Sequence, residues 1–200
     1  MNRDEMTFQA LVYQQAAALM RYPEGLRAPA GAVAGLRPLY ADGSPEADGL
    51  DAMARALEGA DLLDVQRDYT ALFIGAWKML APPYASYHLD GARQLGGPST
   101  VAVEDAYRAR GLVLSQERRK PGDHLSVMLE FLFVLLRDGA GGADGADAQA
   151  AAFFRRFVAP WVPAWGRSVA DQAKTGFYAA WGALAPLILI DDSLLDEPRL

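Results

Sequence analysis

The sequence predicts an all-α fold, a single-domain bundle of roughly eight to ten helices. Apolar residues recur at helical spacing along most of the chain, and no stretch sustains the alternation of apolar and polar residues that is typical of strands. Capping residues, Gly and Pro separate the periodic segments. The 200 residues are 52% hydrophobic, which is enough apolar material for one sizeable core, so we expect one domain over residues 1–200.

In the first half of the chain, four segments show helical spacing of apolar residues. The helices that we expect there cover residues 6–20, 32–40, 45–57 and 62–73. Tyr22-Pro23 ends the first of them, because proline cannot continue a helix. Ser44 and Asp61 precede the third and fourth, and both residue types accept hydrogen bonds from the free N–H groups of a first helical turn.

The second half of the chain shows four further helical segments. We expect these helices over residues 101–110, 125–136, 153–165 and 177–188. Ser99 or Thr100 is the expected cap of the helix over 101–110, and Asp123 is the expected cap of the helix over 125–136. The helix over 125–136 has almost no polar face and so belongs in the centre of a bundle. The Gly/Ala/Asp-rich residues 138–147 predict a flexible loop. Two prolines, at 160 and 163, should kink or split the third helix.

Composition and charge exclude several classes of function. The chain has no cysteine and two histidines that do not share ligand spacing on one helix, so we expect no metal and no cofactor. A P-loop, a GxGxxG motif and a GxSxG motif are all missing from the sequence. The net charge of −6 and the scattered basic residues argue against nucleic acid and make a basic peptide a more natural partner.

The sequence also bears on location. Acidic residues stand near the N-terminus, where a secretory signal would need basic ones, so we expect a cytoplasmic protein. The most apolar run, Leu125 to Leu136, is shorter than the roughly 20 residues that span a bilayer, so no stable membrane insertion is expected.

A proline-rich, aromatic linker covers about residues 75–98. It contains Pro82-Pro83 followed by Tyr84-Ala85-Ser86-Tyr87, with Trp77 shortly before them. Two adjacent prolines stop a helix and favour an extended segment that lies at the surface or lines a groove. The aromatic side chains then have two interpretations. They pack in the core, or they form a rigid platform for an extended or helical peptide.

Asp123, His124 and Glu130 form the second candidate group, an acid/base site of a small enzyme or hydrolase. Neighbouring residues on a helix point about 100° apart, so Asp123 is poorly placed to orient His124. The structural alternative is that Asp123 caps the helix, His124 lies in its first turn, and Glu130 is a buried carboxylate with hydrogen-bonding partners.

Four motifs resemble those of one known family. Tyr69-Thr70-Ala71-Leu72-Phe73-Ile74-Gly75 and Pro82-Pro83-Tyr84-Ala85-Ser86-Tyr87 look like the signature of the TorD/DmsD/NarJ-type redox-enzyme maturation chaperones. The turn Gly97-Pro98-Ser99-Thr100, which precedes a helix with Tyr107, and the segment Asp123-His124-Leu125 follow in the order of that family. The likeness extends from the first helix to the last, and its specific motifs lie in residues 69–132.

The resemblance implies an all-helical cytoplasmic chaperone that is not an enzyme. It would bind the twin-arginine signal peptide and the apo form of a molybdoenzyme of the dimethyl sulfoxide reductase superfamily, assist insertion of the molybdopterin cofactor and delay export. Carried over to this chain, the signal-peptide-binding residues would be Trp77, Pro82, Pro83, Tyr84, Ser86, Tyr87, His88, Asp123 and His124. Asp123 would attract the arginines of the peptide, and the aromatic side chains would accept its apolar stretch.

Some positions depart from the family pattern. Tyr84 stands where the family often has Trp, and His88 stands where some relatives have Trp. The helix after His124 keeps one acid, Glu130, of the two that are frequent in the family. We expect a monomer or a helix-exchanged dimer, because some members of the family can dimerise by exchanging helices, and residues 138–147 are a candidate hinge for that exchange. A helical structural adaptor, whose aromatic residues only pack the core, stays open as a third hypothesis.

Overall fold

The computed structural model describes residues 1–75, 78–91, 93–115 and 121–195, and the regular secondary structure of these residues is helical. These residues form eleven α-helices, one 3₁₀-helix and one π-helix, and their single β-type pairing is an isolated bridge. The all-α prediction is confirmed. The chain divides into two compact units, the first made of residues 1–13, 83–161 and 191–200 and the second of residues 14–82 and 162–190. The expectation of a single domain stays a prediction.

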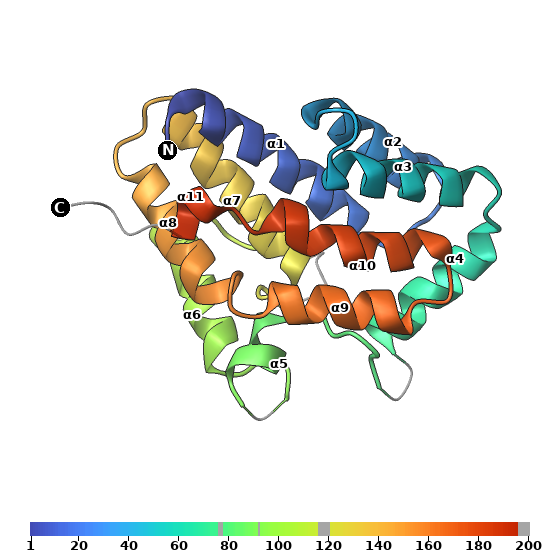
Figure 1. Ribbon diagram of the computed structural model, residues 1–200. Coiled ribbons are helices and arrows are strands. Elements are labelled where there is room, and N and C mark those ends of the chain that lie inside the picture. Colours follow the sequence, from blue (N-terminus) through green and yellow to red (C-terminus); the bar gives the residue numbers. More distant parts are fainter. Residues whose placement is uncertain (76–77, 92, 116–120, 196–200) are drawn as a thin grey trace. The chain divides into compact units, whose positions relative to one another are not determined.

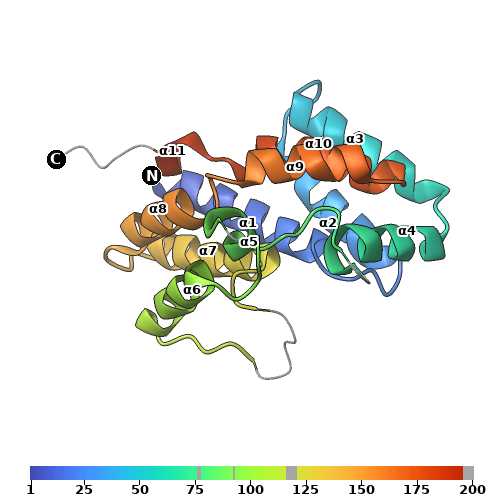
Figure 2. The same ribbon diagram turned by 90° about the horizontal axis from the view of Figure 1, so that it is seen from below.

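Helix α1 (Arg3–Leu19) begins in the first unit and ends in the second. The other helices of the first unit are α5 (Ala85–Leu89), α6 (Pro98–Ala109), α7 (Leu125–Ala140), α8 (Ala146–Phe157) and α11 (Asp192–Leu195). Helices α7 and α8 lie side by side, and α11 packs on α8 (Figure 2). Nearly every residue in the first half of α7 is buried, so its apolar composition places it in the core of this unit, as predicted.

The second unit contains a layer of three neighbouring helices. Its elements are α2 (Arg27–Leu36), the 3₁₀-helix η1 (Arg37–Leu39), α3 (Pro45–Glu58), α4 (Leu62–Tyr69), the π-helix η2 (Thr70–Ile74), α9 (Val162–Gln172) and α10 (Gly176–Leu189). Helix α10 packs against α3 on one side and α9 on the other (Figure 1). A Cβ at Gly182 would lie 2.3 Å from the backbone nitrogen of Ala170, so this close crossing of α9 and α10 requires glycine.

The predicted caps Ser44 and Asp61 are confirmed, and the cap predicted for α6 is wrong. Ser44 accepts a hydrogen bond from the Ala47 N–H, and Asp61 accepts from Leu63 and Asp64. Helix α6, in contrast, begins at Pro98 and has no side-chain cap. The Ser99 N–H and hydroxyl donate to the carboxylate of Asp90 instead, because α5 brings that residue close to the start of α6.

Several predicted boundaries shift. Helix α2 begins five residues before the expected short helix and continues into η1. The helix expected over residues 153–165 is split as predicted, with Pro160 between α8 and α9 and Pro163 in the first turn of α9. The loop expected over residues 138–147 is shorter, because α7 extends to Ala140 and α8 begins at Ala146. The linker over residues 75–98 is not wholly extended, since it contains α5. Within the described chain, no helix is both long enough and apolar enough to cross a membrane.

The family motif at residues 69–75 forms the end of α4 and the π-helix η2. The Gly75 N–H donates to the Thr70 carbonyl at 2.7 Å, five residues back, which is the hydrogen-bond pattern of a π-helix. Gly75 has φ +62°, and a Cβ there would lie 2.5 Å from the backbone of Lys78 and Met79. Glycine is therefore required at this turn both for its positive φ and for the close approach of the returning chain.

Candidate functional site

The prolines and aromatic residues of the linker are joined to the start of α7 by backbone hydrogen bonds. The Leu125 N–H donates to the Pro83 carbonyl at 2.8 Å, and the Ala85 N–H donates to the Asp123 carbonyl at 3.0 Å. Tyr84 and His124 therefore pair as in an antiparallel ladder. Two of the family motifs, far apart in the sequence, meet here in the first unit.

Asp123 is fully buried and reinforces this junction with its side chain. Its Oδ2 accepts a hydrogen bond of 2.8 Å from the Ser86 N–H, which belongs to the first turn of α5. The prediction that Asp123 caps α7 is wrong. Asp123 Oδ1 and the Ser86 hydroxyl are also buried, and neither has a hydrogen-bond partner among the described residues. The junction thus contains two buried polar groups that could each form a further hydrogen bond.

His124 is the residue that caps α7. Its Nδ1 accepts a hydrogen bond of 3.1 Å from the Ser126 N–H and lies 2.9 Å from the Ser126 hydroxyl. The expectation that His124 occupies the first turn of the helix is therefore also wrong. The imidazole is 1% exposed, and its ring meets the Tyr84 ring edge-on at a centroid distance of 5.0 Å. Burial raises the pKa of the Tyr84 hydroxyl, and the negative charge of Asp123 raises it further.

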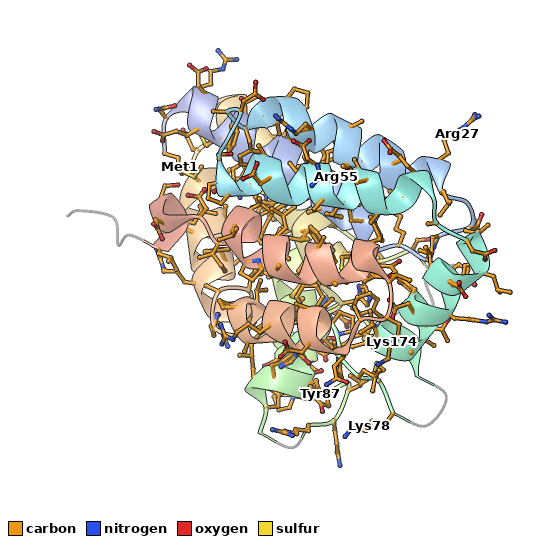
Figure 3. The ribbon with its side chains drawn as sticks, turned by 45° about the vertical axis from the view of Figure 1, so that its right-hand side comes forward. Met1, Arg27, Arg55, Lys78, Tyr87 and Lys174 are labelled. Carbon is orange, nitrogen blue, oxygen red and sulfur yellow. The ribbon has the colours of Figure 1, made fainter. Side chains whose placement is uncertain are left out.

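Tyr87 and His88 continue from this junction along α5, and both side chains are half-buried. Their rings meet edge-on at 5.2 Å, and His88 stacks on Trp161 at 4.6 Å with an angle of 10° between the ring planes. Figure 3 shows Tyr87 on α5. The sequence did not predict that Trp161 belongs to this cluster. Its helical spacing indicated only a core residue, and no local pattern connects it with His88.

The structure thus brings five of the nine predicted site residues into one junction: Pro83, Tyr84, Ser86, Asp123 and His124. Tyr87 and His88 are adjacent to it and offer partly exposed rings. Pro82 is the last residue of a segment in the second unit, and Trp77 lies outside the described residues. A peptide-binding role for the nine residues stays a prediction.

Glu130 lies in a different environment from Asp123 and His124. It is half-buried in a groove of about 250 Å³ whose other lining residues, mostly apolar, come from α6, α7 and the segment 112–115. Asp123 and His124 do not line this groove. Among the described residues, the three side chains of the proposed acid/base group therefore do not share one cavity.

Known proteins resemble this chain in sequence and in fold. The family model of the nitrate reductase delta subunit matches residues 41–166. The chaperone protein TorD of Vibrio vulnificus is 28% identical over 73% of this chain and 71% of its own length. The chaperone protein TorD of Ferrimonas balearica is 30% identical over 75% and 70%, and the Tat proofreading chaperone DmsD of Salmonella typhi is 30% identical over 59% and 55%.

The crystal structure of a redox enzyme maturation protein from Archaeoglobus fulgidus has the same fold, with a TM-score of 0.53 at 20% identity over 94% of both chains. The matched residues 41–166 include all four motifs on which the resemblance rests, so the family expected from them is confirmed. The chain belongs to the nitrate reductase delta subunit family, together with the redox-enzyme maturation chaperones of the TorD and DmsD type.

Proposed function

We propose that this protein is the system-specific chaperone of one molybdoenzyme. It binds the twin-arginine signal peptide of the catalytic subunit and also the apo form of that subunit. It delays export until the molybdopterin cofactor is inserted. The observation that carries the proposal is that the similar curated proteins are named chaperones, one of them a Tat proofreading chaperone. The client would be a member of the dimethyl sulfoxide reductase superfamily.

The junction between the linker and α7 supports peptide binding at this place. Pro83 and Tyr84 are fixed by backbone hydrogen bonds to Leu125 and Asp123, so the segment is ordered before any ligand arrives. A preformed surface loses less conformational entropy on binding than a loop that must first order. Tyr87 and His88 follow directly, and their half-buried rings are suited to apolar contact and to stacking on a guanidinium group.

Asp123 would then act through the linker and not by direct contact. Its carboxylate is buried and already accepts the Ser86 N–H, so an arginine of the peptide could reach it only after the junction opened. We propose that Asp123 holds α5 in the orientation that presents Tyr87 and His88. The net charge of −6 would supply the general attraction for a basic peptide.

The remaining hypotheses have less support. An acid/base enzyme would need Asp123, His124 and Glu130 in one cavity, whereas the described residues place Glu130 in a separate groove and use His124 as a helix cap. The adaptor hypothesis fits the burial of Tyr84 but leaves the partly exposed rings of Tyr87 and His88 without a role. We further propose a cytoplasmic monomer, since a twin-arginine signal is accessible on that side before export; a helix-exchanged dimer is the alternative.

Calorimetric titration with twin-arginine signal peptides tests the proposal. The peptides come from the molybdoenzymes of the source organism, each with a copy in which both arginines are changed to alanine. We expect one peptide to bind near micromolar Kd, about −8 kcal/mol, and its double-alanine copy to bind more weakly. Tyr87→Ala should weaken binding without lowering the melting temperature, because the Tyr87 side chain is only half-buried.

Two outcomes would contradict the proposal in different ways. If no signal peptide and no signal-less apoenzyme bound, the chaperone function itself would be refuted for these clients. If a peptide bound but Tyr87→Ala and His88→Ala left its affinity unchanged, the function would stand and the proposed surface would be wrong.

A further inference from the structure

The outer face of α4 in the second unit carries a groove that the signal-peptide hypothesis does not use. We call it the α4 groove; it has a volume of about 570 Å³ and is lined chiefly by Tyr22, Leu63, Arg67, Ala71, Lys78 and Leu80. Tyr22, Leu63 and Leu80 are 43%, 50% and 39% exposed, so three large apolar side chains meet water at one place. Clustered exposed apolar residues of this kind mark interaction surfaces more often than scattered ones do.

The wall of the α4 groove is preformed. It is built partly on the π-helix η2, and the returning chain is fixed to that helix where the Leu80 N–H donates to the Ala71 carbonyl at 3.1 Å. The side chain of Ser168, on α9, lies 3.5 Å from the Leu80 carbonyl and adds a contact within the same unit. Single π-helical turns occur frequently at functional sites. Hydrogen bonds therefore hold Ala71 and Leu80, on two sides of the groove, in place before a partner binds.

The charges in the α4 groove define the chemistry of its occupant. Arg67 and Lys78 line it, and none of the described residues that line it is acidic, although the whole chain carries a net charge of −6. Arg67 pairs with Asp64 at 3.4 Å on the surface, whereas Lys78 forms no ion pair with any described residue. Figure 3 shows the Lys78 side chain at the outer edge of the chain. A basic signal peptide would meet like charge here, and a segment with a carboxylate would be attracted.

We infer that the α4 groove binds an amphipathic segment of the client enzyme that combines an apolar face with an acidic residue, and that Lys78 pairs with this residue. A small hydrophilic anion would leave Tyr22, Leu63 and Leu80 in water, so the occupant must be largely apolar. The inference rests on the proposed chaperone function and assigns a second surface to it. One protein could then hold the basic signal peptide and an acidic part of the mature enzyme at different places.

Two synthetic amphipathic peptides of about 16 residues, long enough to form a helix, serve as the first probe. They share one leucine face and differ only beside it, where one has glutamates and the other lysines. Titration by fluorescence anisotropy should show tighter binding of the glutamate peptide. Lys78→Glu should weaken that peptide by about fivefold, the upper range of an exposed ion pair, and should strengthen the lysine peptide.

The matched control is Lys174→Glu, the same charge change at an exposed lysine of the same unit that does not line the groove. It should alter neither affinity by more than about twofold, because Lys174 does not line the groove and an exposed charge that makes no direct pair contributes little. Leu63→Ala removes a half-exposed apolar side chain and should weaken both peptides while circular dichroism and the melting temperature stay unchanged. If Lys78→Glu and Lys174→Glu weakened the glutamate peptide equally, the inference would be overturned.

A second measurement links the groove to the client. The signal-less apo catalytic subunit should bind the wild-type protein and bind Lys78→Glu more weakly, while the signal peptide should bind both equally. Reduced binding of the signal peptide to Lys78→Glu would contradict a separate surface. If no client bound at all, the proposed function would fail, but the glutamate and lysine peptides would still show whether the α4 groove selects an acidic, apolar segment.

Discussion

Asp123 Oδ2 accepts a hydrogen bond of 2.8 Å from the backbone N–H of Ser86, and this bond joins the segment before α7 to the first turn of α5. Both residues are completely buried. The interaction explains why two motifs from distant parts of the sequence lie together. It also makes Asp123 a positioning residue in the proposed site.

Asp123→Ala should destabilise the protein, because it leaves the buried Ser86 N–H without its acceptor. A hydrogen bond to a charged group contributes about 2 kcal/mol, which corresponds to a fall in melting temperature of roughly 4–8 °C for a chain of this size. Asp123→Asn keeps an oxygen acceptor and should lose less. Differential scanning calorimetry of the two variants gives the comparison, and equal losses would show that the charge, and not the acceptor, holds the junction.

His124→Ala should remove the cap of α7 and cost about 1 kcal/mol of unfolding free energy. His124→Asn should restore most of it, because a short amide oxygen can also accept the Ser126 N–H. Urea denaturation at neutral pH measures both. If asparagine were as damaging as alanine, the packing of the imidazole on Tyr84 would matter more than the cap.

The raised pKa of Tyr84 makes its contribution to stability depend on pH. Burial and then Asp123 raise this pKa in the folded protein, so the folded state retains the phenolic proton where the unfolded state has already lost it. The contribution is therefore complete below the ordinary tyrosine pKa of about 10 and is lost as the pH rises above it. Wild type should lose more stability than Tyr84→Phe between pH 8 and about pH 11.

The control for this comparison is the difference in stability between the wild type and Tyr84→Phe at neutral pH, where the folded and unfolded states both retain the phenolic proton. Parallel melting curves for Tyr84→Phe and the wild type over the whole alkaline range would contradict the explanation by burial.

Gly75→Ala should be among the most damaging single substitutions in the second unit. It combines a positive φ with a clash at 2.5 Å against the backbone of Lys78 and Met79, and we expect a loss of more than about 3 kcal/mol. Gly43→Ala is the matched control, since Gly43 also has a positive φ but has no atom within 4 Å of an added Cβ. Its cost should stay near 1 kcal/mol. Similar losses for both would rule out the clash as the cause.

Asp68→Ala should loosen the start of α10. The Oδ2 atom of Asp68 accepts hydrogen bonds from the Lys174 N–H, the Thr175 N–H and the Thr175 hydroxyl, at 2.9, 2.7 and 2.7 Å. Loss of these bonds to a charged acceptor should cost about 3 kcal/mol, and Asp68→Asn should cost less. Amide hydrogen exchange should show faster exchange at Lys174 and Thr175 in Asp68→Ala; unchanged protection there would contradict this role.

The helices and two of their caps could be predicted because they depend on neighbours in the sequence. Apolar spacing alone locates α1, α3 and α10 to within a few residues, and Ser44 and Asp61 reach N–H groups only two or three positions ahead. The motifs also predicted which segments would form the candidate site.

The roles within that site could not be predicted in the same way. Asp123 and His124 are adjacent, and either is a reasonable cap by residue type. The N–H of Ser86, 37 positions away, donates to the Asp123 carboxylate, and His124 therefore caps α7. Likewise, Ser99 is a reasonable cap by residue type, but in the folded chain its N–H donates to Asp90 at the end of α5.

By itself, therefore, the sequence determined an all-helical protein of the nitrate reductase delta subunit family, because helix periodicity, helix breakers and family motifs are local patterns. Only the tertiary structure decided which polar groups meet at the linker and that apolar and basic side chains share the α4 groove. Hydrogen-bond partners and exposed surfaces depend on which distant segments pack together, and packing is a property of the folded chain as a whole.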